Sequence, residues 1–537
     1  MSTNDPKTSQ PLDCGSLLLA LPTSLKHERG SPCGRGAVNT KYVLVRSAFS
    51  VFCTRMPTHL DASPKARRSH ILWAQHEFKT LNLGDPRRGR RLKKLAADLL
   101  AQPGASIPKA SGDWAASKAA YRFFDNDAVA PADVLAAHRD AVLGRAHGQP
   151  VVLAVQDTTT LNFSTHRHTR GLGPISNNAD KTIGLHLHST LLLREDGQAL
   201  GVLDTLVFAR DPAQFKAGAK GARNRKPAAE KESRKWMQSA AASARAAGEL
   251  EGTLVINIGD REGDSYELFL QHREERKQGG GSHELLIRCQ HDRRLTHDHD
   301  GLFSHLKKQP IAAHWSVEVP RRPGQKKRTA TLAIRYARVE FAPPAHQAKY
   351  RKQSETITLW AVSAQEENPA ESSGPICWRL LSTAPIAEVA AAITAVKRYS
   401  LRWQIELFHK ILKSGCRIEE RQFESTARIE RCLALEVILA ARILALSRAG
   451  RDETGGSRPA SDWLAEHEWK SLWCHKHRSA TAPQTPPTTR QAMRWIAGLG
   501  GFLGRKGDGE PGMITLWQGL QRLHDIATTW QILNDDL

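Results

Sequence analysis

The stretch YSLRWQIELFHKILKSG, from Tyr399 to Gly415, has the residue types of a helix but an uneven distribution of polar side chains. At about 100° per residue, five polar residues fall in one narrow stripe: Tyr399, Arg402, Glu406, Lys410 and Lys413. The rest of the surface is mostly apolar, so the pattern predicts a helix that is buried on most sides. The polar stripe has two interpretations. It forms i,i+4 ion pairs on a surface, each contributing roughly a few tenths of a kcal/mol, or it lines an active site in which cations surround one carboxylate.

The composition favours a large basic protein with a polyanionic partner. The chain has 537 residues, which is too long for one core and predicts about three or four domains. Lys and Arg number 77 against 55 Asp and Glu, a net charge of +22, and the sequence pI is near 9.8. Because each neutralised phosphate releases counterions, this excess favours a nucleic acid as the partner.

A membrane surface is the rival explanation for the positive charge. No run approaches the roughly 18 to 20 apolar residues of a spanning helix. The N-terminal run SLLLALPTSL is short, follows Asp5 and Asp13, and lacks the basic region of an export signal. We therefore expect no membrane partner and a cytoplasmic location, associated with the nucleoid.

The cysteines and histidines do not form a recognisable metal motif. None of the eight cysteines belongs to a CxxC pair, so neither a zinc ribbon nor a disulfide framework is indicated, and we expect reduced thiols. The run from His297 to Asp300, HDHD, is interpreted as a solvated turn in preference to a metal site.

The N-terminal third divides into two regions. Residues 1–68 are rich in Pro, Gly and Ser and show little periodicity, so we expect a disordered leader or a start-site artefact, with Met56 as the alternative to Met1. Residues 69–138 have a helical pattern and carry a basic cluster after a Gly-Asp-Pro turn: Arg87, Arg88, Arg90 and Arg91. This pattern fits a small helical domain that binds DNA ends, although a solvated basic helix face is the alternative.

The central residues change to short runs of Val, Ile and Leu, such as VVLAVQD and TLVINIGD, which are separated by helical stretches. Such runs are typical of a sheet covered on both faces and predict an α/β core over residues 139–305. Alternating strands then predict a β-rich insertion over 306–385. The stretch 386–425 carries Glu406, and residues 426–537 are helical apart from the linker TAPQTPPTTR.

Two of the core runs end in a carboxylate, Asp157 after VVLAVQ and Asp260 after LVINIG. The carboxyl end of a buried strand is where α/β proteins place ligands, although each residue taken singly fits an ordinary turn. With Glu406 they make a set of three carboxylates, which suits Mg²⁺ or Mn²⁺. Two such ions about 3.5–4 Å apart stabilise the attacking and leaving oxygens of an in-line phosphoryl transfer.

The spacing Tyr399-x2-Arg402-x3-Glu406-x6-Lys413 resembles the Tyr-Arg-Glu-Lys motif of bacterial cut-and-paste DDE transposases of the insertion-sequence-four family. Further stretches are similar to the transposon-five type within this family: LGDPRRGRRL, SKAAYRFF, QDTTTLNF, HSTLLL, EKESRKW, DREGD, HKILKSG and LGGFLGRKG. The resemblance covers residues from about 70 to 530, so nothing is carried over to the leader.

The resemblance implies an α/β fold with an RNase H-like catalytic core, a β-rich insertion, and flanking N-terminal and C-terminal helical domains. It implies that Asp157, Asp260 and Glu406 bind two Mg²⁺ or Mn²⁺ ions per active site. DNA contacts would come from Tyr399, Arg402 and Lys413, which hold phosphates, from Arg288, from Trp378 and Trp403, and from the basic cluster Arg87, Arg88, Arg90 and Arg91. For the two tryptophans the alternatives are stacking on a displaced base and packing in the core.

The implied activity is excision of a transposon from double-stranded DNA by hydrolysis and hairpin formation, followed by joining of its 3′ ends to target DNA. The resemblance implies a homodimer in the DNA complex and no nucleotide cofactor. Much of the dimer contact is expected around MITLWQGLQRLHDIATTW, where Leu516, Leu520 and Leu523 form an apolar stripe, with intrachain packing as the alternative.

Two other functions remain open from the sequence. A non-catalytic inhibitor that binds the same DNA is one, and the presence of all three carboxylates argues against it. A metal-dependent nuclease that cannot join strands is the other, and a strand-transfer assay separates it from a transposase.

Overall fold

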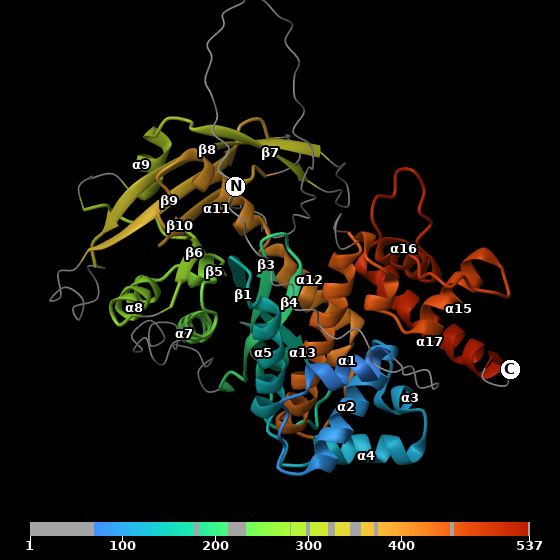
Figure 1. The fold of residues 1–537 in the computed structure, drawn as a ribbon. Coiled ribbons are helices and arrows are strands. Elements are labelled where there is room, and N and C mark those ends of the chain that lie inside the picture. The colour runs from blue at the N-terminus through green and yellow to red at the C-terminus, as the bar shows by residue number, and fades with distance from the viewer. Residues whose placement is uncertain are drawn as a thin grey trace, which may run out of the picture.

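The computed structural model describes residues 69–176, 182–212, 232–279, 281–296, 301–319, 328–343, 356–369, 374–451 and 456–534 (Figure 1). The leader 1–68 and the run from His297 to Asp300 lie outside the described residues. Helices from the N-terminal part lie at one end of the molecule, a large sheet lies in the middle, and C-terminal helices lie to one side (Figure 1). No described helix is long and apolar enough to cross a membrane.

The N-terminal part is helical, as the sequence predicts. Its helices are α1 (Ser69–Glu77), α2 (Pro86–Ala101), α3 (Ile107–Ser111), α4 (Trp114–Phe124) and α5 (Pro131–Ala146). Helix α2 begins at the Gly-Asp-Pro turn because Asp85 caps it, accepting a 2.8 Å hydrogen bond from the backbone N–H of Arg87. Pro86, which lacks an N–H, fits the first turn. The leucines of helix α2 are buried, while its arginines lie on the outer side.

The described strands form a ten-stranded sheet in the order β2-β3-β1-β5-β6-β10-β9-β8-β7, with β4 also paired to β3. The strands of the first half are β1 (Val151–Asn162), β2 (Gly173–Pro174), β3 (Ile183–Arg194), β4 (Ala199–Phe208), β5 (Leu254–Gly259) and β6 (His283–Arg288). Strands β4, β3 and β1 are antiparallel neighbours, while β1, β5 and β6 are parallel. This β4-β3-β1-β5-β6 arrangement is that of an RNase H-like core and confirms the predicted fold class.

The β-rich insertion continues the same sheet. It contains α9 (Leu302–Lys308), β7 (Ala313–Val319), β8 (Arg328–Phe341), β9 (Ile357–Glu366) and β10 (Cys377–Ser382). Strand β10 pairs antiparallel with β6, so the insertion is joined to the core by backbone hydrogen bonds. Its four strands form the yellow part of the sheet in Figure 1. The end of β6 is therefore held between β5 and β10, the last strand of the insertion along the chain.

Helices cover the core sheet as the continuous apolar runs predict. Helix α7 (Arg234–Glu249) packs against β1, β3, β4, β5 and β6, and α8 (Tyr266–Lys277) packs against β6 and α7. Helix α5 and the long helix α13 (Thr426–Ala449) pack against β4. Because both faces are covered, ten of the twelve residues of β3 are buried, including His188.

The prediction of one helix over residues 399–415 is wrong. Helix α11 (Val389–Ser400) ends first, and α12 (Trp403–Lys410) begins after a turn that contains Arg402. In this turn the hydrogen bonds tighten to i→i−3, from the N–H of Arg402 to Tyr399 and from Gln404 to Leu401. Beyond α12, a π-helical segment, η4 (Ile411–Gly415), carries Lys413. The polar stripe is therefore divided among three local geometries, although the segment is buried on most sides as expected.

The C-terminal part consists of η6 (Ala460–Asp462), α15 (Glu466–His477), α16 (Thr489–Leu499) and α17 (Met513–Asn534). Leu516, Leu520 and Leu523 are at most 8% exposed and belong to the same core cluster as Ile496 of α16. The structure thus supports intrachain packing for this stripe. The exposed large apolar residues of α17 are instead Ile514, Ile532 and Leu533.

Candidate active site

Asp157 and Asp260 lie beside each other just beyond the parallel pairing of two strands. Asp157 is not at the end of its strand, as the sequence suggested, because β1 continues to Asn162 as an antiparallel partner of β3. The parallel pairing of β1 with β5 ends at Val155 and Ile258. Each aspartate is two residues beyond that pair, and Asp260 begins the short helix η3 (Arg261–Gly263).

The strand register aligns three of the predicted site residues in one row. Paired residues of β1 and β5 differ by 254 − 151 = 103, which is also the difference between Asp157 and Asp260. Paired residues of β5 and β6 differ by 283 − 255 = 28, which is the difference between Asp260 and Arg288. The two carboxylates and the guanidinium therefore come from the same level of three neighbouring parallel strands.

The row also lies on one face of the sheet. Side chains alternate along a strand, so Asp157 shares a face with Leu153 and Val155, while Asp260 shares a face with Ile258. These apolar residues pack in the same cluster as Ile405 and Phe408 of α12. Helix α12 therefore covers the face to which the row belongs, which brings Glu406 to the aspartates.

Arg402 joins two of the three predicted carboxylates. Its Nη1 donates to Oδ2 of Asp157 at 2.9 Å, and its Nη2 donates to Oε1 of Glu406. The guanidinium is 12% exposed, and the two carboxylates are 19% and 26% exposed. The i,i+4 pair of Arg402 with Glu406 is therefore present, but it is largely buried, and Arg402 also binds Asp157, which is 245 positions away in the sequence.

Burial and like charge shift the proton affinities of this cluster. Burial raises the pKa of Asp157 to about 6; Arg402 opposes this effect and the carboxylate of Asp260 reinforces it. Burial likewise raises the pKa of Asp260. Burial alone would lower the pKa of Arg402, but the electrostatic effect of Tyr399, Asp157 and Glu406 raises it above its usual value. Arg402 is therefore a permanent cation beside carboxylates that lack a full counter-charge.

The other predicted phosphate-binding residues surround this cluster. Tyr399 ends α11 and is 4% exposed, and burial raises the pKa of its hydroxyl, whereas Arg402 and Arg288 act to lower it. Arg288 also donates to the backbone oxygen of Cys377 at 3.2 Å. Lys413 lies further along, with its Nζ 3.6 Å from Glu419. Arg402 and Arg288 therefore lie beside the carboxylates, whereas Lys413 contacts Glu419.

The two predicted stacking tryptophans differ in their surroundings. Trp378 on β10 is 4% exposed and packs edge-to-face on Tyr399, with ring centroids 5.6 Å apart. Core packing, the alternative considered for this residue, is what the structure shows, and base stacking would require the ring to move. Trp403, at the start of α12, is partly exposed, and its indole N–H is buried and has no hydrogen-bond partner among the residues that the structure describes.

The donor set fits a hard divalent cation, although the carboxylates are not gathered into a cage. Among the described residues, no three His, Cys, Asp or Glu side chains lie close enough to form a metal site as arranged. Arg402 separates Asp157 from Glu406 and supplies positive charge to both. Carboxylate oxygens whose affinity for protons is raised by a neighbouring carboxylate are the ligands that Mg²⁺ and Mn²⁺ favour. Arg402 binds one oxygen of Asp157 and one of Glu406, so a metal would compete with it for those two oxygens.

Two more charged residues near Asp260 were not expected from the sequence. Lys235, at the start of α7, is buried and binds Oε2 of Glu262 at 3.1 Å. Asp264 accepts hydrogen bonds from the N–H groups of Gln290 and His291, at 2.7 and 3.1 Å, and so fixes the chain that follows Arg288. The sequence pointed to these two residues only through the stretches that contain them, EKESRKW for Lys235 and DREGD for Asp264. Their partners are distant in the sequence, so no local pattern predicts the contacts.

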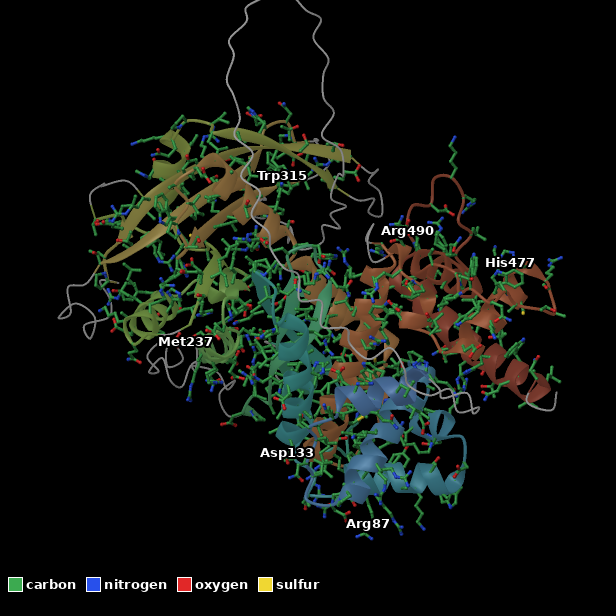
Figure 2. The ribbon with its side chains drawn as sticks, viewed as in Figure 1. Arg87, Asp133, Met237, Trp315, His477 and Arg490 are labelled. Carbon is green, nitrogen blue, oxygen red and sulfur yellow. The ribbon has the colours of Figure 1, made fainter. Side chains whose placement is uncertain are left out.

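The basic cluster of the N-terminal part is largely open to solvent. Arg87 is 81% exposed and points away from the molecule at the outer edge of the N-terminal helices (Figure 2). Arg90 is exposed and Arg91 is half-buried. Arg88 differs, because its Nη1 donates to the backbone oxygen of Leu83 at 2.8 Å. Arg87 and Arg90 are thus the most exposed of the four arginines, although Nη2 of Arg87 pairs with Asp85 at 2.8 Å in an exposed ion pair that a DNA phosphate would have to replace.

A row of carboxylates on an RNase H-like sheet, with cations beside it and a basic helical module attached, defines an enzyme that acts on the phosphodiester bonds of nucleic acid. Three family models match the chain: Transposase DNA-binding over residues 70–129, Transposase DDE domain over residues 219–441, and Transposase Tn5 dimerisation domain over residues 438–529. The chain therefore belongs to the DDE transposases of the insertion-sequence-four family, of the transposon-five type. It is a DNA-binding, homodimeric enzyme that depends on a divalent metal. Asp260 and Glu406 lie within the matched DDE domain, and Asp157 precedes it.

Proposed function

We propose that this protein cuts a transposon out of double-stranded DNA and joins it to a target, and that Asp157, Asp260 and Glu406 are its catalytic carboxylates. The observation that carries the proposal is the convergence of these three residues around Arg402 on one face of the sheet. We further propose that the domains run over residues 69–138, 139–305, 306–385, 386–425 and 426–537, and that the protein works in the cytoplasm at the nucleoid.

The chemistry begins with hydrolysis of one phosphodiester bond at each transposon end, which releases a 3′-hydroxyl. That hydroxyl attacks the opposite strand and forms a hairpin, a second water opens the hairpin, and the 3′-hydroxyl finally attacks target DNA. Two Mg²⁺ or Mn²⁺ ions bound by the three carboxylates would supply activation of the attacking oxygen and charge stabilisation at the phosphorus. No nucleotide cofactor is needed, because each step either hydrolyses a phosphodiester bond with water or exchanges one phosphodiester bond for another.

The protein residues bind and orient the DNA in this scheme. Arg402 and Arg288 lie beside the carboxylates, and Lys413 lies on the π-helical segment that follows α12. Charge-assisted hydrogen bonds from these three residues would hold the phosphates on either side of the cut. The exposed arginines of α2 would hold the DNA end through its backbone. Asp264 would act indirectly by fixing the chain after Arg288.

Incubation of the purified full chain with the inverted repeats that flank its own gene tests the proposal. With Mg²⁺ we expect nicked, hairpin and excised products on denaturing gels, and strand transfer into a plasmid. Asp157→Ala, Asp260→Ala and Glu406→Ala should each abolish cleavage while end binding in gel shifts is kept, because the carboxylates serve chemistry and the basic module serves binding.

Glu430→Ala is the matched control, because burial also raises the pKa of this carboxyl on α13, outside the row. It should cleave like the wild type. Substantial Mg²⁺-dependent nicking by any of the three variants contradicts the assignment. Cleavage without strand transfer would indicate a nuclease, and end binding without cleavage by the wild type would indicate an inhibitor.

A further inference from the structure

A cavity of about 400 Å³ lies where the N-terminal helices, the core and the C-terminal part meet. Helices α1, α5 and α13 come together here, as Figure 1 shows, and strand β4 and the segment around η6 complete the wall. A cavity of this size lies within the range of about 300–1,000 Å³ that small-molecule sites occupy. The charged groups on its wall decide what could bind there.

One carboxylate in the wall is already neutralised. Glu77, which is 3% exposed, accepts from Nη1 and Nη2 of Arg145 at 2.9 and 3.0 Å. It also contacts Nδ1 of His138, whose Nε2 accepts from the backbone N–H of Val202 at 2.9 Å. Nε2 of this ring is thus occupied by the backbone, and Nδ1 faces Glu77. Glu77 is matched by its two hydrogen bonds with Arg145 and its contact with His138.

The other acidic group of the wall is matched in the same way. Asp462 pairs with Arg458 at 2.7 Å. Arg194, at the end of β3, pairs with Asp196. Each acidic group of the wall is therefore already paired with an arginine, and none is left to pair with the remaining cation.

That cation is Arg442 of α13. Its guanidinium lies 4.2 Å from the ring centre of Trp463 and 5.8 Å from that of Trp73. Within the described part of the chain, no carboxylate or carbonyl group forms a hydrogen bond or ion pair with it. Burial lowers the pKa of Arg442 to about 10; the positive charge of Arg145 also lowers it, whereas the negative charge of Glu77 raises it. An arginine remains charged at that value, so the cavity has one uncompensated positive charge.

We propose that this cavity binds a small oxyanion, a phosphate or carboxylate compound, through the guanidinium of Arg442. A planar guanidinium is suited to two-pronged hydrogen bonding with such groups. The two tryptophan rings hold Arg442 in place and leave its edge for the ligand. The site is separate from the carboxylate row, and the proposal does not depend on the function proposed above.

The ligand would strengthen the junction of the three parts of the chain. Trp73 lies in the segment matched by the DNA-binding model, while Arg442 and Trp463 lie in the segment matched by the dimerisation model. An anion between them binds the folded arrangement and not the unfolded chain, so it raises the melting temperature by mass action. The effect should be seen without DNA.

Thermal melting and calorimetry of the full chain test the site with three probes: inorganic phosphate, pyrophosphate and citrate. Sodium chloride at matched ionic strength corrects for general screening of this basic protein. At saturation we expect at least one probe to raise the melting temperature by on the order of 3 °C over chloride, with one molecule bound per chain. Citrate separates carboxylate recognition from phosphate recognition.

Variants locate the binding. Arg442→Met should abolish the shift, and Arg442→Lys, which keeps the charge, should weaken binding about tenfold. Ala445→Phe fills the cavity without changing its charge and should also abolish binding, so the test survives if Arg442→Met does not fold. Arg338→Met, which removes an exposed arginine of β8, is the control and should bind normally.

Two results would overturn the proposal. One is the absence of any shift over chloride with all three probes, which would leave a water-filled cavity. The other is equal binding by the wild type, Ala445→Phe and Arg442→Lys, which would mean that the anions bind elsewhere on the basic surface.

Discussion

Asp157 and Asp260 stand at the same level of two neighbouring parallel strands, because the pairing of β1 with β5 has a constant offset of 103 residues. Arg288 of β6 lies level with Asp260 on the next strand. Arg402 supplies positive charge to Asp157 and also binds Glu406. Two of the three carboxylates are thus joined by a cation that would compete with a divalent metal for one oxygen of each.

Arg402→Gln should increase the stabilisation that Mg²⁺ gives. In the wild type the metal competes with a guanidinium for oxygens of Asp157 and Glu406, whereas in the variant those oxygens are free to bind it. The measurement is the rise in melting temperature between protein treated with a chelator and protein in Mg²⁺. Ca²⁺ gives a second value without cleavage.

Arg398→Gln is the control, because Arg398 lies on the neighbouring helix α11 and pairs with Glu195 outside the row. It should show the wild-type response to Mg²⁺. An Arg402→Gln protein that gains no more from Mg²⁺ than this control would show that the guanidinium and the metal do not share ligands.

Replacing Arg87, Arg88, Arg90 and Arg91 with Ala should weaken DNA binding and flatten its salt dependence. Each lost phosphate contact reduces the slope of log K against log salt by about 0.9. The structure refines this prediction, because Arg87 and Arg90 are exposed while Arg88 binds the backbone of Leu83. Arg87→Ala and Arg90→Ala should therefore each change the slope more than Arg88→Ala.

Arg338→Ala changes the net charge equally but lies on β8, far from the N-terminal module in sequence. Fluorescence anisotropy with end DNA at several salt concentrations gives the slopes. If Arg87→Ala and Arg338→Ala give the same slope, the basic cluster is only a solvated helix face.

The sequence predicts the sheet and two of the three carboxylate positions because these depend on local patterns. Runs of Val, Ile and Leu end close to Asp157 and Asp260, and parallel strands bring such ends together. The break between α11 and α12 could not be predicted, because the turn at Arg402 contains no Gly or Pro and arises from i→i−3 hydrogen bonds. The ion pair between Arg402 and Asp157 depends on how α12 packs on β1, which no local pattern encodes.

Trp378→Ala should lower the melting temperature by many degrees. The ring is 4% exposed and packs on Tyr399, and removal of a buried Trp costs about 3–5 kcal/mol. If Trp378 instead stacks on a displaced base, the other alternative that the sequence left open, the variant should stay stable and accumulate nicked ends with little hairpin. Melting of the purified variant distinguishes the two.

Trp378→Phe tests base stacking without emptying the core. It keeps an aromatic ring against Tyr399 and should melt closer to the wild type. A normal yield of hairpin on denaturing gels is expected if Trp378 only packs. Loss of hairpin in a variant that nicks normally would restore the role in stacking and require the ring to move during the reaction.

The buried ion pair between Arg421 and Glu436 of α13 should be highly sensitive to substitution. Arg421 Nη2 lies 2.7 Å from Glu436 Oε1, both residues are at most 6% exposed, and Nη1 also donates to the backbone oxygen of Ala105. Arg421→Met leaves a buried carboxylate without its cation and should cost about 3–5 kcal/mol. The double variant Arg421→Met, Glu436→Leu should recover part of this loss, because both charges are then absent.

The control is Arg417→Met, which removes a cation from an exposed pair with Glu420 and should change the melting temperature little. If Arg421→Met melts like Arg417→Met, the buried pair contributes no more to stability than the exposed pair.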